Sequence, residues 1–303
     1  MSPRNANGLY LIMGGHSHTP LGDFAGAVGK YPTIVENSEG EEVVIVQAYR
    51  WGEYLGYIDD EDLQSQIDGW RKPFEEFAAQ VVGESKVVLD QSLCLQQECL
   101  LGNFMADAML QYRVNNTTPE TAPAFALINA GGVRATIDEG PITRGEVLTS
   151  FPFGNSIFEI SMSGERLWSA LEGIMSKVNQ VNGCPVTSLL QVSRGIVIEY
   201  NPDASATTKL VAVTIGSKPL DKAAEYRIVT LDFLAGGGDN FFDPPFKNPV
   251  VLDTQDTVLV DYIGYTTPVD IKFEGRIKPI SRCRQKFLAK KAKRAADQGP
   301  MKA

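Results

Sequence analysis

The sequence predicts an α+β protein with a mixed sheet. Apolar strand-like runs and helical stripes alternate along most of the chain, without the regular strand–helix–strand series of a parallel-sheet protein. No internal repeat occurs. With 303 residues, of which 43% are hydrophobic and 21% charged, the chain is long enough for about two globular domains.

Composition excludes several functions. Lys plus Arg total 28 against 37 Asp plus Glu, a formal charge of −9, which argues against nucleic-acid binding. No apolar run approaches the roughly 20 residues of a membrane span. The run at residues 9–13 is also too short for a signal-peptide core, so the chain as written shows no secretion signal.

The first part of the chain predicts a small strand cluster followed by a helix. Residues 9–13, 43–46 and 54–58 are strand candidates. An apolar stripe at three- and four-residue spacing then predicts a helix over 60–82 that ends at Gly83. Pro73 should kink this helix or divide it into two shorter ones. We place the domain boundary at the start of this helix, so residues 1–59 form one part and residues 83–281 another.

The second part predicts the main body of the fold. Helices are expected over 98–112, 163–175 and 256–265, the second with Ser163 as N-cap. Strands are expected over residues 87–89, 125–128, 157–162, 195–200, 210–215, 226–231 and 271–280. The basic segment 282–303 is expected to be a solvated helix or tail.

Histidine limits the metal chemistry. The chain has two histidines, His16 and His18, which follow a glycine pair after the first strand. In extended backbone they point the same way, as two imidazole ligands of a divalent metal would. A histidine in a polar turn is the alternative. A two-metal phosphoesterase site needs further histidines, so this chain carries at most one edge of such a site.

The four cysteines allow three pairings or four free thiols. Cys94 and Cys99 flank a short polar segment, and Cys184 and Cys283 are left over. Residues 115–118, Asn-Asn-Thr-Thr, hold two overlapping glycosylation sequons. Neither feature decides the compartment.

Three glycine-containing segments could carry chemistry. Residues 129–134 (Asn-Ala-Gly-Gly-Val-Arg) follow a strand, and Arg134 could pair with a phosphate or bridge hydroxyls. A glycine turn with a surface arginine is the alternative. Residues 151–155 and 233–242 each place an aromatic residue beside glycine. Taken one at a time, each Phe is better explained by core packing than by contact with a ligand. Two Phe rings that face each other could stack on the two sides of a purine. Asp239 could accept hydrogen bonds from ribose hydroxyls.

Together these segments resemble the 5′-nucleotidase family, in its secreted fungal and animal ecto-enzyme branch, from about Leu9 to Ile280. Residues 14–19 (Gly-Gly-His-Ser-His-Thr) resemble the last metal-ligand loop of the metallophosphoesterase domain. Residues 98–103 with 107–110 resemble the first helix of the C-terminal domain. Residues 129–134 resemble its substrate loop, and 151–155 and 233–241 the segments with its stacking aromatics.

The resemblance implies a role for each matching residue. His16 and His18 correspond to ligands of a two-metal site holding Zn or Mn. Asn129, Gly132 and Arg134 correspond to substrate-loop positions. Phe153 and Phe233 correspond to the base-stacking pair, Asp239 to the ribose-binding acid, and Cys94 and Cys99 to a disulfide.

The implied fold is a mixed-sheet nucleotidase C-terminal domain preceded by the remnant of an α/β/β/α metallophosphoesterase domain. The implied reaction is hydrolysis of nucleoside 5′-monophosphates, and the implied location is extracellular. The implied ligand is a nucleoside or its monophosphate, and a homodimer is left open.

Departures from the family pattern predict that this chain alone is inactive. The Asn-His catalytic pair and most metal ligands are missing, Leu95 stands where a second substrate arginine belongs, and Ala130 replaces a glycine. The segment between Ile58 and Leu63 is short. These gaps predict an N-terminally truncated product or a pseudoenzyme, with a non-catalytic nucleoside-binding module as the alternative.

Overall fold

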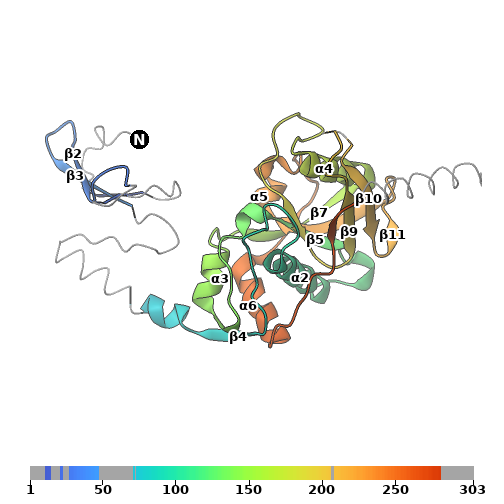
Figure 1. Ribbon diagram of the computed structural model, residues 1–303, viewed down its shortest axis with the longest axis horizontal. Coiled ribbons are helices and arrows are strands. Elements are labelled where there is room, and N and C mark those ends of the chain that lie inside the picture. The colour runs from blue at the N-terminus through green and yellow to red at the C-terminus, as the bar shows by residue number, and fades with distance from the viewer. Residues whose placement is uncertain are drawn as a thin grey trace, which may run out of the picture. The chain divides into compact units, whose positions relative to one another are not determined.

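The computed structural model describes residues 11–14, 21–22, 27–47, 71, 73–205 and 208–280. The chain divides into two compact units, Met1–Glu76 and Phe77–Ala303 (Figure 1). Several predictions fall outside the described residues: His16, His18, the strand at 54–58, Cys283 and the basic segment 282–303. Within the described ranges, no helix is long and apolar enough to cross a membrane.

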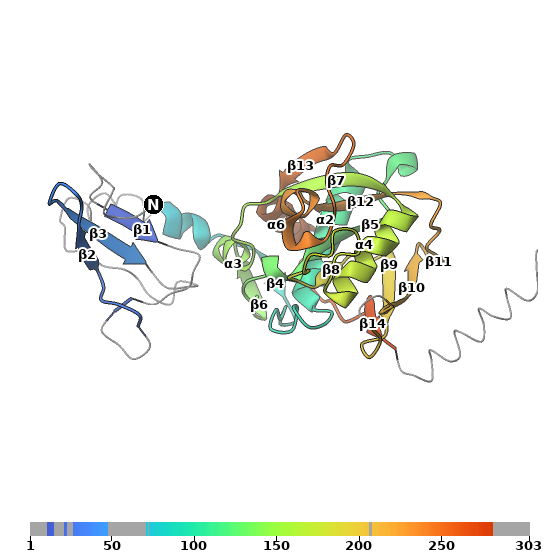
Figure 2. The ribbon, with the colours of Figure 1, turned by 90° about the horizontal axis from the view of Figure 1, so that it is seen from above.

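The first unit contains a three-stranded sheet (Figure 2). Its strands are β1 (Leu11–Gly14), β2 (Thr33–Glu36) and β3 (Glu42–Gln47), with β3 parallel to β1 and antiparallel to β2. Asn37 closes the β2–β3 turn, since its Oδ1 accepts from the backbone N–H groups of Glu39 and Glu41. β2 was not predicted, because its apolar run is only two residues long.

The segment joining the two units differs from its prediction. Residues 73–78 are helical, but β4 (Val81–Ser85) begins inside the helix predicted over 60–82 and pairs antiparallel with β6 (Gly140–Thr143). Val81, which completed the predicted apolar stripe, is exposed. A strand partner from a distant segment has overridden the local helical pattern.

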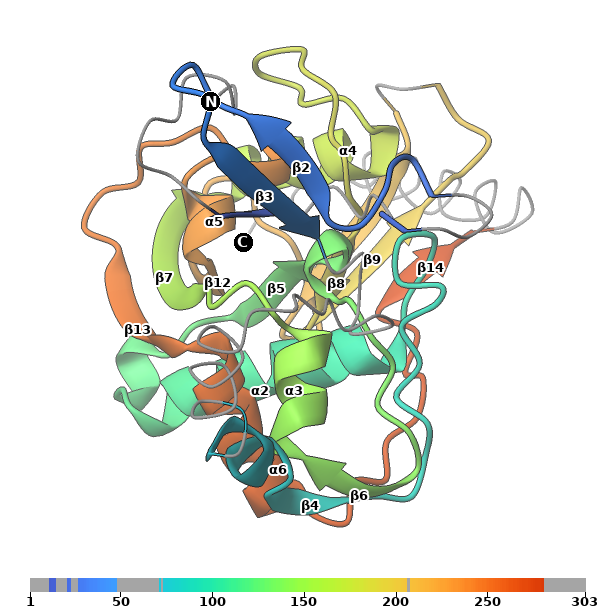
Figure 3. The same ribbon diagram turned by 90° about the vertical axis from the view of Figure 1, so that its left-hand side faces the viewer.

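The second unit is built on a mixed five-stranded sheet, and this confirms the predicted α+β class (Figure 3). The strand order is β13-β7-β12-β5-β8, with β5 parallel to β12 and the other pairs antiparallel. The bounds are β5 Phe125–Asn129, β7 Ser156–Ser163, β8 Leu190–Val192, β12 Glu225–Leu231 and β13 Val250–Thr254.

Helices cover both faces of this sheet, with α2 and α6 on one face and α4 on the other (Figures 2 and 3). Every residue of β5 is therefore buried. The helices are α2 Leu100–Asn115, α3 Arg144–Ser150, α4 Gly164–Ser176, α5 Asp232–Ala235 and α6 Gln255–Thr266. Ser163 caps α4 as predicted, since its side chain accepts from the Arg166 N–H.

A second sheet and three short 3-10 turns complete the unit. The sheet has the order β11-β10-β9-β14 and consists of β9 Ile196–Tyr200, β10 Leu210–Ile215, β11 Lys218–Pro219 and β14 Ile277–Pro279. The turns are η2 Pro119–Thr121, η3 Ala130–Gly132 and η4 Gly238–Asn240.

Cys94 and Cys99 form a disulfide immediately before α2. Cys99 is also the N-cap residue of α2, and its sulfur accepts from the Gly102 N–H. The buried Gln191 side chain holds this segment, because it accepts from the Cys99 N–H and donates to the Cys94 carbonyl. Cys184 is a free, exposed thiol.

Candidate functional site

Four loops meet where the strands of the five-stranded sheet begin or end, on one side that we call the loop edge. Because β5 and β12 are parallel, both end at this edge; β7 and β8 run antiparallel to them and begin there. The loops that follow or precede these strands contain residues 130–134, 151–155, 187–189 and 232–242. The topology thus gathers all three glycine-containing segments singled out in the sequence, together with one that was not.

Asn129 and Asp239 are joined at this edge. The Asn129 Nδ2 donates to the Asp239 Oδ2 at 2.7 Å, and the Thr187 hydroxyl donates to the Asp239 Oδ1 at 2.5 Å. Asp239 has a φ of 53° within η4, two residues after Gly237, which has a φ of 95°. The glycines around Asp239 therefore allow a backbone path that turns this carboxylate toward Asn129.

A second brace holds the loop after β5. The Gly131 N–H donates to the buried Ser188 Oγ at 2.9 Å, and the Lys177 Nζ donates to the Ser188 carbonyl at 2.7 Å. Partial burial lowers the pKa of Lys177, while the negative charge of Asp239 acts in the opposite direction. The dipeptide Thr187–Ser188 thus ties the loop after β5 to the loop carrying Asp239.

Gly132 leaves space for Asn129 in the same loop. A Cβ at Gly132 would lie 3.1 Å from the Asn129 Oδ1, tighter than an ordinary contact. That oxygen is buried and, among the described residues, has no hydrogen-bond partner. A side chain at position 132 would therefore press on the amide that orients Asp239.

Arg134 and Phe153 lie against each other. The Arg134 guanidinium is 5.7 Å from the centre of the Phe153 ring, and its Nη1 donates to the Gly131 carbonyl at 3.1 Å. The Arg134 backbone N–H donates to the Ser150 carbonyl, which links the loop after β5 to the end of α3. Phe153 itself is 47% exposed.

Phe233 covers the glycine turn that carries Asp239. A Cβ on Gly238 would lie 2.5 Å from a Phe233 ring carbon, so the ring occupies the space where a side chain would stand. Phe233 is 45% exposed. Neither Phe153 nor Phe233 belongs to the buried core, unlike the neighbouring Phe151 and Phe241.

The described contacts connect all six residues predicted to bind substrate. The Phe153 ring lies against Arg134, and Arg134 donates to the carbonyl of Gly131, which precedes Gly132. Asn129 donates to Asp239, and Asp239 follows Gly238, which the Phe233 ring covers. Thr187 and Ser188 were missed by the sequence analysis. They lie between Val186 and Leu189 with no glycine or aromatic residue beside them, and the pairing of β8 with β5 brings them here.

Most of the second unit matches a known domain family. A family profile described as the 5′-nucleotidase C-terminal domain matches residues 81–246, more than half of the chain. The chain belongs to the 5′-nucleotidase family. This confirms the resemblance found in the sequence.

Relatives and solved structures agree with this family. An apyrase of Tabanus yao is 31% identical over 312 residues, covering 89% of this chain and 56% of the relative. Human 5′-nucleotidase is 28% identical over 330 residues, covering 91% and 55%. The crystal structure of a 5′-nucleotidase precursor from Thermus thermophilus matches with a TM-score of 0.63 at 31% identity, covering 92% of this chain and 61% of that one.

This chain spans about half the length of the curated relatives it matches. In the described part of the chain, no group of three or more His, Cys, Asp or Glu side chains could hold a metal ion. His16 and His18, the residues predicted to bind metal, lie outside the described residues. The metal-binding roles of His16 and His18 stay predictions.

Proposed function

We propose that this chain is part of a phosphohydrolase that cleaves nucleoside 5′-monophosphates with water, and that its second unit binds the nucleoside. The observation that carries the proposal is the pair of half-exposed rings, Phe153 and Phe233, on loops joined through Arg134, Asn129 and Asp239. Large aromatic side chains left open beside polar groups are typical of ligand sites.

The rings would bind the base. A flat heterocycle stacked on an aromatic side chain contributes about 1–3 kcal/mol, judged by alanine substitution. Every base has a π-face, so stacking does not select one base over another. The site as described therefore supports a nucleoside ligand without choosing among purines and pyrimidines.

Asp239 would bind the ribose. A carboxylate has about four acceptor positions on its two oxygens. Asn129 takes one on Oδ2 and Thr187 takes one on Oδ1, which leaves each oxygen able to accept from one further hydroxyl. Two neighbouring hydroxyls of a ribose match this arrangement.

Arg134 would neutralise negative charge near the ligand. Its guanidinium has five N–H donors, and Nη1 is shared with the Gly131 carbonyl. Its position against Phe153 places a positive charge beside the stacking ring. A phosphate next to the base site would benefit from this charge.

A nucleoside-binding module without catalysis by this chain is the second candidate. It is favoured by the histidine count, since the sequence holds two histidines and a two-metal site needs more. An assay of AMP hydrolysis with added Zn or Mn distinguishes the two candidate functions. Turnover that His16→Ala abolishes supports the hydrolase, and nucleoside binding without turnover supports the module.

We also propose an oxidising, extracytoplasmic location. The support is the Cys94–Cys99 disulfide at the start of α2, because disulfides persist mainly in secreted and other oxidising compartments.

Calorimetry with adenosine tests the binding site. We expect the 303-residue chain to bind, and Phe153→Ala and Phe233→Ala each to weaken affinity by about 5- to 150-fold, the equivalent of about 1–3 kcal/mol. Phe273→Ala is the control, since Phe273 is exposed and belongs to none of the four loops of the site. Absence of binding, or equal affinity of all four proteins, would contradict the proposal.

A further inference from the structure

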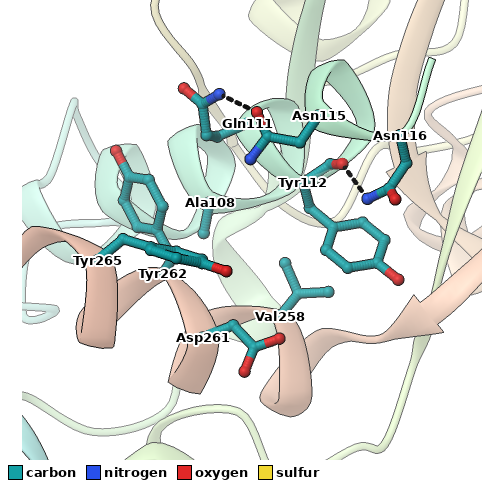
Figure 4. Close-up of a pocket in the computed structure, with 9 residues that line it drawn as sticks. All are labelled: Ala108, Gln111, Tyr112, Asn115, Asn116, Val258, Asp261, Tyr262 and Tyr265. Atoms are coloured by element: carbon teal, nitrogen blue, oxygen red, sulfur yellow. Dashed lines mark hydrogen bonds between the residues drawn. The ribbon is translucent and has the colours of Figure 1, made fainter.

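A hollow of about 200 Å³ lies between α2 and α6 and shares no residue with the nucleoside site (Figure 4). Its apolar side consists of tyrosine rings with small aliphatic side chains, and its polar side of amides and one carboxylate. The lining residues are Ala108, Gln111, Tyr112, Asn115, Asn116, Val258, Asp261, Tyr262 and Tyr265.

This lining suits a single sugar ring. Ring faces of a sugar are apolar and pack on aromatic side chains, while its hydroxyl and acetamido groups need donors and acceptors such as Gln111 and Asp261. The volume is below the roughly 300–1,000 Å³ of pockets for larger ligands. Tyr265 is 81% exposed, so one aromatic ring at the rim has most of its surface uncovered.

Two residues of the lining are the asparagines of the overlapping sequons. Asn115-Asn116-Thr117 and Asn116-Thr117-Thr118 both have the acceptor pattern for N-linked glycans. Both asparagines are exposed. A sugar attached to either one would start at the hollow.

The hydrogen bonds distinguish the two asparagines. The Asn116 Nδ2 donates to the Tyr112 carbonyl at 2.7 Å and so satisfies the end of α2. Asn115 instead uses its oxygen, which accepts from the Gln111 Nε2 at 2.8 Å. Its Nδ2 makes no hydrogen bond to any described residue, and Figure 4 shows this nitrogen turned toward the hollow.

We propose that Asn115 carries an N-linked glycan whose first N-acetylglucosamine lies in the hollow between α2 and α6. The proposal rests on the extracytoplasmic location proposed above, and it is independent of nucleoside binding. Attachment at the Asn115 Nδ2 replaces one N–H and preserves the Gln111 hydrogen bond, whereas attachment at Asn116 modifies the nitrogen that caps α2.

Glycan mapping on the chain secreted from eukaryotic cells behind a leader peptide tests the attachment. Thr117→Val removes the Asn115 sequon alone, and Thr118→Val removes the Asn116 sequon alone. The variants are matched, because each threonine hydroxyl bonds the Thr121 hydroxyl in the folded protein. We expect the glycan on Asn115, lost in Thr117→Val and retained in Thr118→Val. A glycan on Asn116, or on neither residue, would overturn the proposal.

Thermal unfolding tests whether the sugar occupies the hollow. Tyr265→Ala is compared with wild type before and after enzymatic removal of the glycan, and Tyr265→Phe is the control that keeps the ring. We expect Tyr265→Ala to lower Tm by about 2–4 °C in the glycosylated protein only, an effect of the size of one lost contact. An equal change in Tm with and without the glycan would contradict a sugar bound in the hollow.

Discussion

The buried half of α2 and the loop edge of the five-stranded sheet use polar groups in opposite ways. In α2, Asp107 is buried and accepts from both terminal nitrogens of the buried Arg276, at 2.9 and 2.8 Å. Glu98 accepts from the Arg276 backbone and from the Asn103 amide. At the loop edge, Asp239 keeps acceptor positions that its partners among the described residues do not use.

This difference separates stability from binding. A buried charge must find its partners within the protein, because losing one leaves the other unpaired away from water. At the loop edge, Phe153 and Phe233 are half exposed. Their exposure gives up part of the free energy that full burial would contribute, and it keeps the faces of the rings open to a ligand. Substitutions in the buried half of α2 should therefore change mainly the free energy of unfolding, whereas substitutions at the loop edge should also change the affinity for adenosine.

Arg276→Met is expected to have the largest effect on stability. Among the described residues it leaves the buried Asp107 with Arg194 as its one charged partner, and removing one member of a buried pair costs about 3–5 kcal/mol. Urea unfolding measures the loss. Lys222→Met, which breaks the exposed pair with Glu165, should cost less than about 1 kcal/mol. Equal losses would erase the contrast between buried and exposed polar groups.

Gly238→Ala is expected to damage binding and stability together. The new methyl group would stand 2.5 Å from the Phe233 ring, so the ring must move, at a cost of about 1–3 kcal/mol for overpacking. Adenosine affinity and Tm should both fall. Gly264→Ala in α6 is the control: nothing lies within 4 Å, and alanine should stabilise the helix by up to about 1 kcal/mol.

Thr187→Val tests whether Asp239 must be oriented to recognise ribose. The variant removes a hydrogen bond to a charged group, a contribution of about 1.5–3 kcal/mol. We expect the preference for adenosine over 2′,3′-dideoxyadenosine to shrink, and Thr187→Ser to restore it. If Thr187→Val binds adenosine more weakly but keeps the same preference, Thr187 acts only on the fold.

Lys177→Met should give the smallest effect, seen in the pH dependence of stability. Burial lowers the pKa of Lys177 in the folded protein, so its charged form is less favourable there than in the unfolded chain. Wild type should therefore gain stability relative to Lys177→Met as the pH rises toward the ordinary lysine pKa of about 10.4. The gain is small because much of Lys177 is exposed, and a loss with rising pH would reverse the assigned cause.

Local patterns predicted a large part of this fold. The helix predicted over residues 163–175 with Ser163 as N-cap and the helix predicted over 256–265 both occur, as α4 and α6. The Cys94–Cys99 disulfide followed from the family resemblance and is present. The helix predicted over 60–82 was wrong at its end, since Val81 belongs to a strand whose partner lies about sixty residues later.

The sequence by itself determined the α+β class, the family and the chemical character of the loops, because apolar periodicity and glycine-aromatic motifs are local properties of the chain. Only the tertiary structure decided that Thr187 orients Asp239, that Ser188 holds Gly131, and that Asn115 faces a hollow. These contacts join residues far apart in the chain, and strand pairing and helix packing bring such residues together without leaving a local signal at either one.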